Sequence, residues 1–254
     1  MTSDGLVVTA VRDRVLYVQI NRPEKRNALS RAVLGALGDA FRGAAGDLSL
    51  VAAVVSGAGE KCFAAGGDLN EFDQLRSEDD GRTMALLARD ALDAIRRFPV
   101  PVVAALNGDA LGGGAELAAS CDFRIAAPHA RVGFIQGRLS IATAWGGGID
   151  LVRIVGRQKA LRLLSTARIV DASEALSLGF LDEVADSAGG LSTSVEAFLA
   201  PVRELVPQSQ RAFKAVARAS FDRTDAEAVE LANFAACWGH ADHWVAHDRI
   251  LARS

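Results

Sequence analysis

Two glycine-rich turns carry the residues whose types and spacing suggest chemistry. One turn spans Cys62–Leu69 (CFAAGGDL), the other spans Asn107–Glu116 (NGDALGGGAE), and each follows an apolar run rich in β-branched residues. A backbone N–H can approach a developing negative charge only where no side chain blocks it, and glycine also permits the positive φ angles that turn an amide inward. The pairing predicts that one amide from each turn holds the same oxygen atom, as the oxyanion of a thioester would require.

Neither turn fits a dinucleotide-binding loop. The segment GAGEKC, which follows the predicted strand Val51–Val55, lacks the third glycine of GxGxxG, and GGGAE has the wrong spacing. One such turn alone is more often a tight corner between a strand and a helix. NAD binding is therefore disfavoured, and the corner interpretation remains the alternative for either turn by itself.

Strands and helices alternate through the first three quarters of the chain. Apolar patterns predict strands at Val7–Ala10, Val15–Ile20, Val51–Val55, Val102–Leu106 and Phe123–Ala126. Helices are expected from the capping Ser30 to about Gly43, from about Thr83 to Phe98, and from the second turn to Ser120. The polar stretch Asn70–Arg82 is expected to be a mobile lid. The order is typical of an α/β fold, either a doubly wound sheet or a coil of ββα turns, which periodicity does not separate.

The pattern changes at about Ser192, after which the chain is predicted to be almost entirely helical. The expected helices are Ser209–Ser220, Asp225–Cys237 and Ala241–Arg253, each with an apolar face. We therefore divide the chain into a core over residues 1–191 and a helical region over residues 192–254. Apolar faces on such a tail indicate docking or contacts between copies of the chain.

Composition limits the partners that the protein can have. The 254 residues are half apolar and carry a net charge of -3, so there is no bulk attraction to nucleic acid. The N-terminal MTSDGLVVTA has no basic segment followed by a long apolar stretch, and the chain has no charge-free run of about eighteen residues. We expect one main domain, a cytoplasmic location, and no nucleic-acid or membrane partner.

Cysteines and histidines offer two further candidates. Cys62, Cys121 and Cys237 are odd in number and widely separated, which favours reduced thiols over disulfides or a metal cluster. His240, His243 and His247 have helical spacing, so a shared metal is geometrically possible. A polar helix face at a subunit contact is the alternative that we favour, because no motif such as HExxH is present. No metal is predicted.

Four segments resemble the crotonase, or enoyl-CoA hydratase/isomerase, superfamily. They are NRPEKRNALS at Asn21–Ser30, FAAGGDL and NGDALGGGAELAASCDF in the two turns, and DASEALSLGFLDEV at Asp171–Val184. The resemblance implies a crotonase-like spiral of ββα turns and a C-terminal helical trimerisation region, in a homotrimer or a dimer of trimers. It also implies an acyl-CoA substrate, which brings coenzyme A without a separate cofactor, and an oxyanion pair at the amides of Gly67 and Gly113.

The same resemblance raises the question of the acid and base groups. Hydratases of the superfamily commonly use two glutamates, and Glu116 matches the first. Without gaps, the segment Arg131–Gly148 places Gln136 where the second glutamate would be. An amide cannot exchange protons near neutral pH as a carboxyl group can, so ordinary hydration is disfavoured unless the register is offset.

Decarboxylation avoids the need for a base, because loss of carbon dioxide itself leaves an enolate. The strings FAAGGDLNEF, AWGGG at Ala144–Gly148 and CWGHAD at Cys237–Asp242 are similar to the ethylmalonyl-CoA decarboxylase branch, although that branch does not carry glutamine at position 136. We expect ethylmalonyl-CoA or methylmalonyl-CoA as substrate, its carboxylate oriented by Gln136 or Trp145, with Glu116 as proton donor or steering a water. The alternatives are a hydratase or isomerase using Glu116 alone, and a noncatalytic acyl-CoA binding protein.

The resemblance also implies where the coenzyme A lies. The adenine is expected near the backbone of Ala65 and the pantetheine near Arg26 and Ala28, while Lys25 or Arg26 is available for the phosphates. Asp68 and Leu69, at the end of the first turn, are also predicted to contact the substrate.

Overall fold

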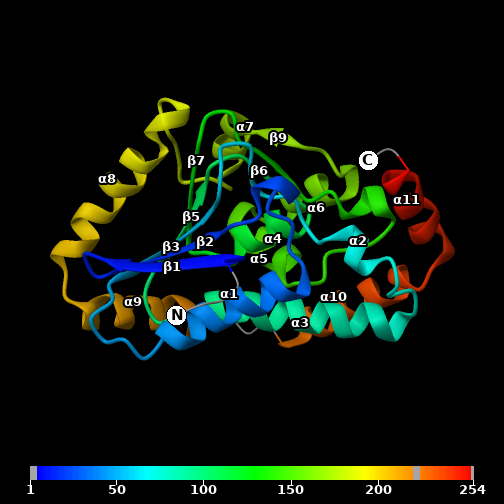
Figure 1. The fold of residues 1–254 in the computed structure, drawn as a ribbon, viewed down its shortest axis with the longest axis horizontal. Helices are drawn as coiled ribbons and strands as arrows, with labels where there is room; N and C mark the ends of the chain where they lie inside the picture. The colour runs from blue at the N-terminus through cyan, green and yellow to red at the C-terminus, as the bar shows by residue number, and fades with distance from the viewer. Residues whose placement is uncertain (1–4, 220–223, 253–254) are drawn as a thin grey trace.

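The computed structural model describes residues 5–219 and 224–252. Its main feature is a six-stranded sheet (Figure 1) with the order β1 (Val7–Arg12), β2 (Val15–Ile20), β3 (Ala52–Gly57), β5 (Val102–Leu106), β7 (Phe123–Ala126) and β10 (Glu183–Val184). The strands β1 and β2 are antiparallel, and each later neighbour is parallel to the one before it. Asp13 and Arg14, both with positive φ, form the tight turn between β1 and β2.

The remaining strands form a second sheet. It has the order β4 (Cys62–Ala64), β6 (Asp109–Leu111), β8 (Arg131–Gly133) and β9 (Val170–Asp171). The chain passes from β3 to β4, from β5 to β6 and from β7 to β8, so each turn adds one strand to each sheet. This repeated step is the predicted spiral of ββα turns, and it rules out a doubly wound single sheet.

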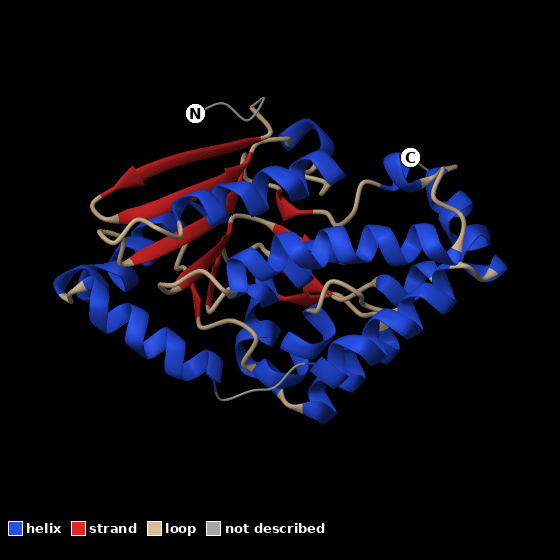
Figure 2. Ribbon diagram, turned by 90° about the horizontal axis from the view of Figure 1, so that it is seen from below, coloured by secondary structure: helices blue, strands red, loops and turns tan. Residues whose placement is uncertain are grey.

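Eleven α-helices lie in the described residues and surround the sheets (Figure 2). In chain order they are α1 (Arg31–Ala44), α2 (Leu69–Phe72), α3 (Glu78–Arg96), α4 (Gly113–Ser120), α5 (Gly147–Val155), α6 (Arg157–Thr166), α7 (Ala172–Leu178), α8 (Leu191–Glu204), α9 (Pro207–Ala219), α10 (Thr224–Trp238) and α11 (Ala241–Leu251). Short 3-10 helices occupy Pro23–Lys25, Gln136–Leu139 and Ala188–Gly190.

The two faces of the six-stranded sheet are covered by different helices. Alternate residues of a strand point to opposite faces. Val55 packs in the cluster that contains Leu34 of α1, whereas Val54 packs in the cluster that contains Val195 and Leu199 of α8. The sheet is therefore buried on both sides, which explains the continuous apolar character of its central strands.

The predicted boundary of α3 is wrong by about one helical turn. The helix begins at Glu78, not near Thr83, because Ser77 and Asp80 form a reciprocal capping box that satisfies amides at the start of the helix. The helix α2 takes up another part of the stretch that was predicted to be a lid. The predicted strand at Val51–Val55 is also shifted, since β3 starts at Ala52 and runs to Gly57.

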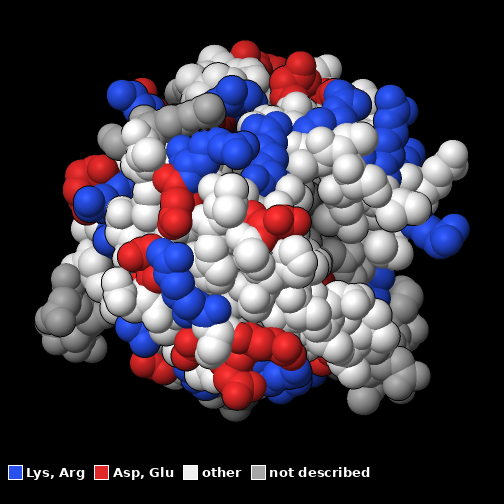
Figure 3. Space-filling model, turned by 90° about the vertical axis from the view of Figure 1, so that its right-hand side faces the viewer, with Lys and Arg blue, Asp and Glu red and all other residues white. Residues whose placement is uncertain are grey.

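The three C-terminal helices are present close to their predicted positions, although the predicted ends at Ser220 and Arg253 lie outside the described residues. Among the described residues, no helix has both the length and the apolar character needed to cross a membrane. Acidic and basic side chains are interspersed over the face that Figure 3 shows, in keeping with the small net charge.

Candidate active site

The two glycine-rich turns lie against each other. Because β4 and β6 are parallel neighbours, the turns that follow them emerge at the same edge of the second sheet. Gly66 (φ +99°) and Gly112 (φ +54°) both have left-handed backbone conformations, which favour glycine. A Cβ atom on Gly66 would lie 3.0 Å from the Leu111 carbonyl oxygen and 3.4 Å from the Gly113 nitrogen, so the two turns are in contact.

The amide of Gly113 starts a helix. As the first residue of α4, Gly113 has no acceptor for its N–H within the helix, and the helix dipole adds positive potential at this point. The neighbouring turn atoms are engaged elsewhere: the Leu29 N–H donates to the Gly66 carbonyl (2.8 Å) and the Gly112 N–H donates to the Gly133 carbonyl (2.8 Å). Within the described turns, loops and caps, no backbone carbonyl accepts from the amide of Gly67 or Gly113.

Both turns open into a pocket of about 360 Å³. The predicted site residues Gly67, Gly113, Glu116, Gln136, Trp145, Arg26, Ala65 and Leu69 all line it. The helices α10 and α11 close another side of the pocket with Phe234, Trp238, His243 and Ile250. The structure therefore brings most of the predicted site into one cavity, and the C-terminal helices form part of its wall.

Glu116 is the one carboxylate among the described residues that line this pocket. Its side chain is buried (2 % exposed) on the first turns of α4. One carboxylate oxygen, Oε2, accepts hydrogen bonds from the amides of Trp145 and Gly147, each at 2.9 Å. Burial and, to a smaller extent, the charge of Glu230 raise the pKa of Glu116, whereas the donated hydrogen bonds lower it, and the result is a pKa of about 8. The protonated form of Glu116 is therefore favoured relative to that of an exposed glutamate.

Gln136 lies beside this carboxyl group. Its Nε2 donates to Glu116 Oε1 (2.8 Å), while its own Oε1 is buried with no hydrogen-bond partner. The ungapped placement of the sequence thus puts the amide next to Glu116, in the pocket, as predicted. An unpaired buried amide oxygen is costly, so this side chain is poised for a further contact.

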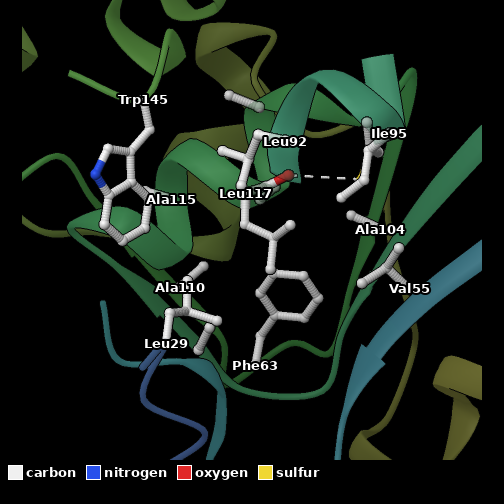
Figure 4. Close-up of a cluster of buried hydrophobic side chains, with 14 of the residues drawn as sticks. Leu29, Val55, Phe63, Leu92, Ile95, Ala104, Ala110, Ala115, Leu117 and Trp145 are labelled. Atoms are coloured by element: carbon white, nitrogen blue, oxygen red, sulfur yellow. Dashed lines mark hydrogen bonds between the residues drawn. The ribbon is translucent and has the colours of Figure 1, made fainter. Parts of the chain in front are cut away.

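Trp145 forms the border between the pocket and the core. Its six-membered ring packs so closely on Gly113 that a Cβ atom at that position would overlap it. Figure 4 shows the indole at the edge of the cluster that contains Phe63 and Leu117, with its nitrogen directed away from the cluster. The glycine at 113 is thus required by a close approach of side chain to backbone.

Three of the predicted substrate-binding residues do not line the pocket. The side chain of Asp68 accepts a hydrogen bond from the Arg22 guanidinium (3.1 Å). The carbonyl of Ala28 accepts from the same guanidinium (3.0 Å), and Lys25 is exposed at the end of a 3-10 helix. The backbone of Ala65 does meet this segment, because its N–H donates to the Arg26 carbonyl (3.1 Å).

The sequence interpretation missed Glu230 and Arg89. Glu230 on α10 is buried and pairs with Arg89 on α3 (3.0 Å), and it accepts hydrogen bonds from the loop that holds Trp145. A signal was available, since Glu230 shares a helical face with Phe234 and Trp238 and so is an acid on an apolar face.

The three C-terminal histidines have different contacts. His240 caps the helix, His243 contacts the Leu139 carbonyl, and His247 contacts the Leu69 carbonyl. His243 and His247 are buried within this chain, so the expected polar face is wrong for them.

Burial raises the pKa of the Cys62 thiol to about 11, as fits an inert side chain.

Comparisons with known proteins show which family the chain is similar to. Residues 11–242 match the family model described as enoyl-CoA hydratase/isomerase. The chain is 36% identical over 190 residues to a short-chain-enoyl-CoA hydratase of Clostridium acetobutylicum, a match that covers 75% of this chain and 72% of that protein. It is 30% identical over 230 residues to an ethylmalonyl-CoA decarboxylase of Xenopus laevis, covering 89% of this chain and 77% of that protein.

A solved structure carries the same fold. An enoyl-CoA hydratase from Mycobacterium avium subsp. paratuberculosis superposes with a TM-score of 0.87 at 23% identity, over 98% of this chain and 100% of that one. The predicted crotonase-like fold is thereby confirmed. Hydratase and decarboxylase relatives have similar identity to this chain, so the relatives do not decide between the two reactions.

Proposed function

Because this chain belongs to the enoyl-CoA hydratase/isomerase family, we propose that it is an acyl-CoA lyase that decarboxylates ethylmalonyl-CoA or methylmalonyl-CoA. The observation that carries the proposal is the amide of Gln136 beside Glu116. Addition of water to an enoyl thioester needs groups that move protons on and off water, and the described lining of the pocket offers a single carboxyl group for this task. Loss of carbon dioxide needs only a proton donor.

The amides of Gly67 and Gly113 stabilise the charge that this reaction develops. The bond between the α-carbon and the carboxylate breaks, carbon dioxide leaves, and the electron pair moves to the thioester oxygen. Two main-chain donors aimed at that oxygen, one of them at a helix N-terminus, favour the enolate over the substrate. Losing one such donor typically costs about 3 kcal/mol of transition-state stabilisation.

Glu116 then supplies the proton. With its pKa near 8, the carboxyl group carries a proton at pH 7 and can transfer it to the α-carbon of the enolate, which yields the saturated acyl-CoA. The carboxylate that remains is stabilised by the amides of Trp145 and Gly147, and a proton from water restores it.

Gln136 orients the substrate carboxylate. While Glu116 is protonated, its O–H needs an acceptor, and Gln136 turned by half a rotation of its amide would offer the unpaired Oε1. That rotation directs the Gln136 NH₂ group into the pocket, where it can donate to the carboxylate of the substrate. The Trp145 indole N–H, directed away from the core, is the second donor that we assign to this carboxylate.

The coenzyme A is proposed to follow the Arg26 segment. The hydrogen bond between Ala65 and Arg26 holds two backbone segments together at the mouth of the pocket, and the exposed Lys25 and Arg26 are available to its phosphates. Ala28 and Asp68 would then act through the Arg22 contacts that shape this segment and not by lining the acyl pocket.

A second function is favoured by one observation, the 36% identity to a short-chain-enoyl-CoA hydratase. In that case Glu116 alone would direct water to the enoyl double bond, or shift the double bond. This function requires turnover of crotonyl-CoA by the unmodified protein.

The test is a comparison of products. Purified protein incubated in D₂O with ethylmalonyl-CoA or methylmalonyl-CoA should yield the saturated acyl-CoA with one deuterium at the α-carbon, detected by mass spectrometry, while crotonyl-CoA remains unchanged. Gln136→Glu should lower decarboxylation and introduce water addition, and Gln158→Glu, the same change at an exposed position of α6, should do neither. No release of carbon dioxide from either substrate would refute the proposal. Tight binding of butyryl-CoA without turnover of any thioester would favour a binding protein.

We also propose that the C-terminal helices join copies of this chain into a trimer or a dimer of trimers. Large apolar side chains remain exposed there, including Phe213 on α9 (62 % exposed) and Val229 on α10 (61 % exposed). Light scattering of the purified protein should show three or six copies, and Phe213→Ser should lower that number. A monomeric wild-type protein would refute the assignment.

A further inference from the structure

One loop in the site is held between two buried carboxylates. Residues 143–148 precede and begin α5, and the amides of residues 145–148 alternate in direction. Those of Trp145 and Gly147 donate to Glu116, whereas those of Gly146 (2.8 Å) and Gly148 (3.1 Å) donate to Glu230. The Thr143 hydroxyl also donates to Glu230 (2.8 Å). The loop is therefore bound from both sides, once by α4 and once by α10.

Arg89 completes the contact on the Glu230 side. Its guanidinium donates to Glu230 Oε2 (3.0 Å) and to the Ala144 carbonyl (2.8 Å), and it also reaches the Glu227 carbonyl (3.0 Å). The side chains of Arg89 and Glu230 are more than nine-tenths buried. An ion pair so enclosed stabilises only when its remaining donors and acceptors are satisfied, and here the loop and α10 satisfy them.

Glu230 also lies on the face of α10 that forms one wall of the acyl pocket. Phe234 and Trp238 follow it at intervals of four residues, so the three side chains share one face of α10. Phe234 and Trp238 line the pocket, and Glu230 holds the loop that carries Trp145. The position of α10 and the position of the loop are thus coupled through one side chain.

We propose that Glu230 is a positioning residue that fixes the loop 143–148 and the α10 wall relative to each other, and so places Trp145 beside the Gly113 turn. Nothing in the family match assigns a role to this residue. The inference rests on the proposed function only for its turnover readout, since the contacts concern the protein without substrate.

Glu230 also acts on Glu116 through its charge. The charged groups around the loop include Glu230 on α10, Arg89 on α3, and Arg96, which pairs with Asp150 and Asp93 and donates to the Trp145 carbonyl (2.8 Å). On the pocket side, Glu116 shares the cavity with Arg26, Arg138 and His243. The negative charge of Glu230 raises the pKa of Glu116. Removing that charge lowers the pKa of Glu116, so the alkaline loss of turnover should begin at lower pH.

The experiment compares Glu230→Gln with Glu230→Asp. Glu230→Gln keeps the shape of the side chain but removes its charge. We expect the affinity for butyryl-CoA to fall about tenfold or more. The alkaline decline of kcat should occur about one pH unit lower than in the wild type. Glu230→Asp keeps the charge but shortens the side chain, so the affinity for butyryl-CoA should fall while the pH of the alkaline decline of kcat stays unchanged. Glu204→Gln, at the exposed end of α8, should change neither quantity.

Infrared titration without substrate separates this inference from the proposed function. The wild-type minus Glu116→Gln difference spectrum reports the protonated carboxyl band of Glu116, and its midpoint should move to lower pH in the Glu230→Gln background. An unchanged midpoint together with unchanged butyryl-CoA affinity would overturn the inference, whether or not the protein decarboxylates any substrate.

Should Glu230→Gln not fold, Thr143→Val removes one contact of Glu230 without altering its charge. Both Thr143→Val and Glu230→Asp should then weaken butyryl-CoA binding by about threefold or more, in the range of one lost hydrogen bond. Affinity equal to that of the wild type in both variants would overturn the positioning role.

Discussion

Replacing Glu116 with glutamine should make the stability of the protein less dependent on pH. The usual pKa of a glutamate, 4.5, applies to the unfolded chain, whereas burial and the charge of Glu230 raise the pKa of Glu116 to about 8 in the folded protein. Between these values the unfolded chain has released the proton and the folded protein retains it. The unfolded state then binds fewer protons, so the free energy of unfolding falls as pH rises through this window.

The size of this change in the free energy of unfolding follows from the difference between the two pKa values. At about 1.4 kcal/mol per pKa unit, the rise from 4.5 to about 8 is equivalent to roughly 5 kcal/mol, and roughly 3 kcal/mol of this has been lost by pH 7. Glutamine does not ionise, so this component is absent from Glu116→Gln. For a chain of this size each kcal/mol changes the Tm by about 2–4 °C, which gives a total change on the order of 10 °C.

The assay is thermal unfolding followed by circular dichroism between about pH 5 and pH 8.5, the range in which the two states differ in protonation. The Tm of Glu116→Gln minus that of the wild type should increase steadily with pH, while Glu204→Gln should track the wild type throughout. A Tm difference that is independent of pH would refute the assignment of a proton to Glu116, and with it the proton-donor role.

Three further predictions concern single contacts. Gly113→Ala should lower kcat/KM by about 100-fold or more, because the added methyl group would overlap the Trp145 ring and displace the Gly113 amide. The control is Gly35→Ala on α1, where the methyl group meets open space and activity should be retained. A near-normal kcat/KM in Gly113→Ala would show that the Gly113 amide takes no part in the reaction. Asp122→Asn should lower the free energy of unfolding by about 3 kcal/mol, because it leaves the buried Lys214 ammonium, 2.6 Å from Asp122, without its charge partner. Lys214→Met should lower the free energy of unfolding by less. Equal losses of stability in thermal unfolding would contradict this account. Asn27→Ala should cost about 2 kcal/mol, since the buried Asn27 side chain donates to the carbonyls of Ala58 and Cys62, and chemical denaturation showing no loss would contradict that role.

The fold and the centre of the site could be predicted from local features. Glycines at 66, 112 and 113 mark backbone conformations and close approaches that other residues resist, so the two turns were recognisable before their neighbours were known. Gln136 was found because its segment aligns with the family without gaps. These features depend on a few adjacent residues, which is why sequence reasoning reached them.

The missed parts depend on contacts between distant residues. Arg89 and Glu230 lie 141 positions apart, and no periodic pattern indicates which buried acid meets which buried base. The start of α3 was missed for a different reason, because the polar stretch before it conceals a capping box at Ser77 and Asp80. Ala28 was assigned to the substrate from the family resemblance and Asp68 as part of the first turn, whereas their contacts with Arg22 emerge only from the tertiary structure.

The alternating amides of residues 145–148 also limit how this chain can change in evolution. An inserted or deleted residue at this point would exchange the carboxylates that the following amides face, and it would displace either Trp145 or the start of α5 from its present contacts. Side chains here could vary within the space allowed, but the length of the segment could not. Homologues that keep both acids should therefore show no gaps across these four positions.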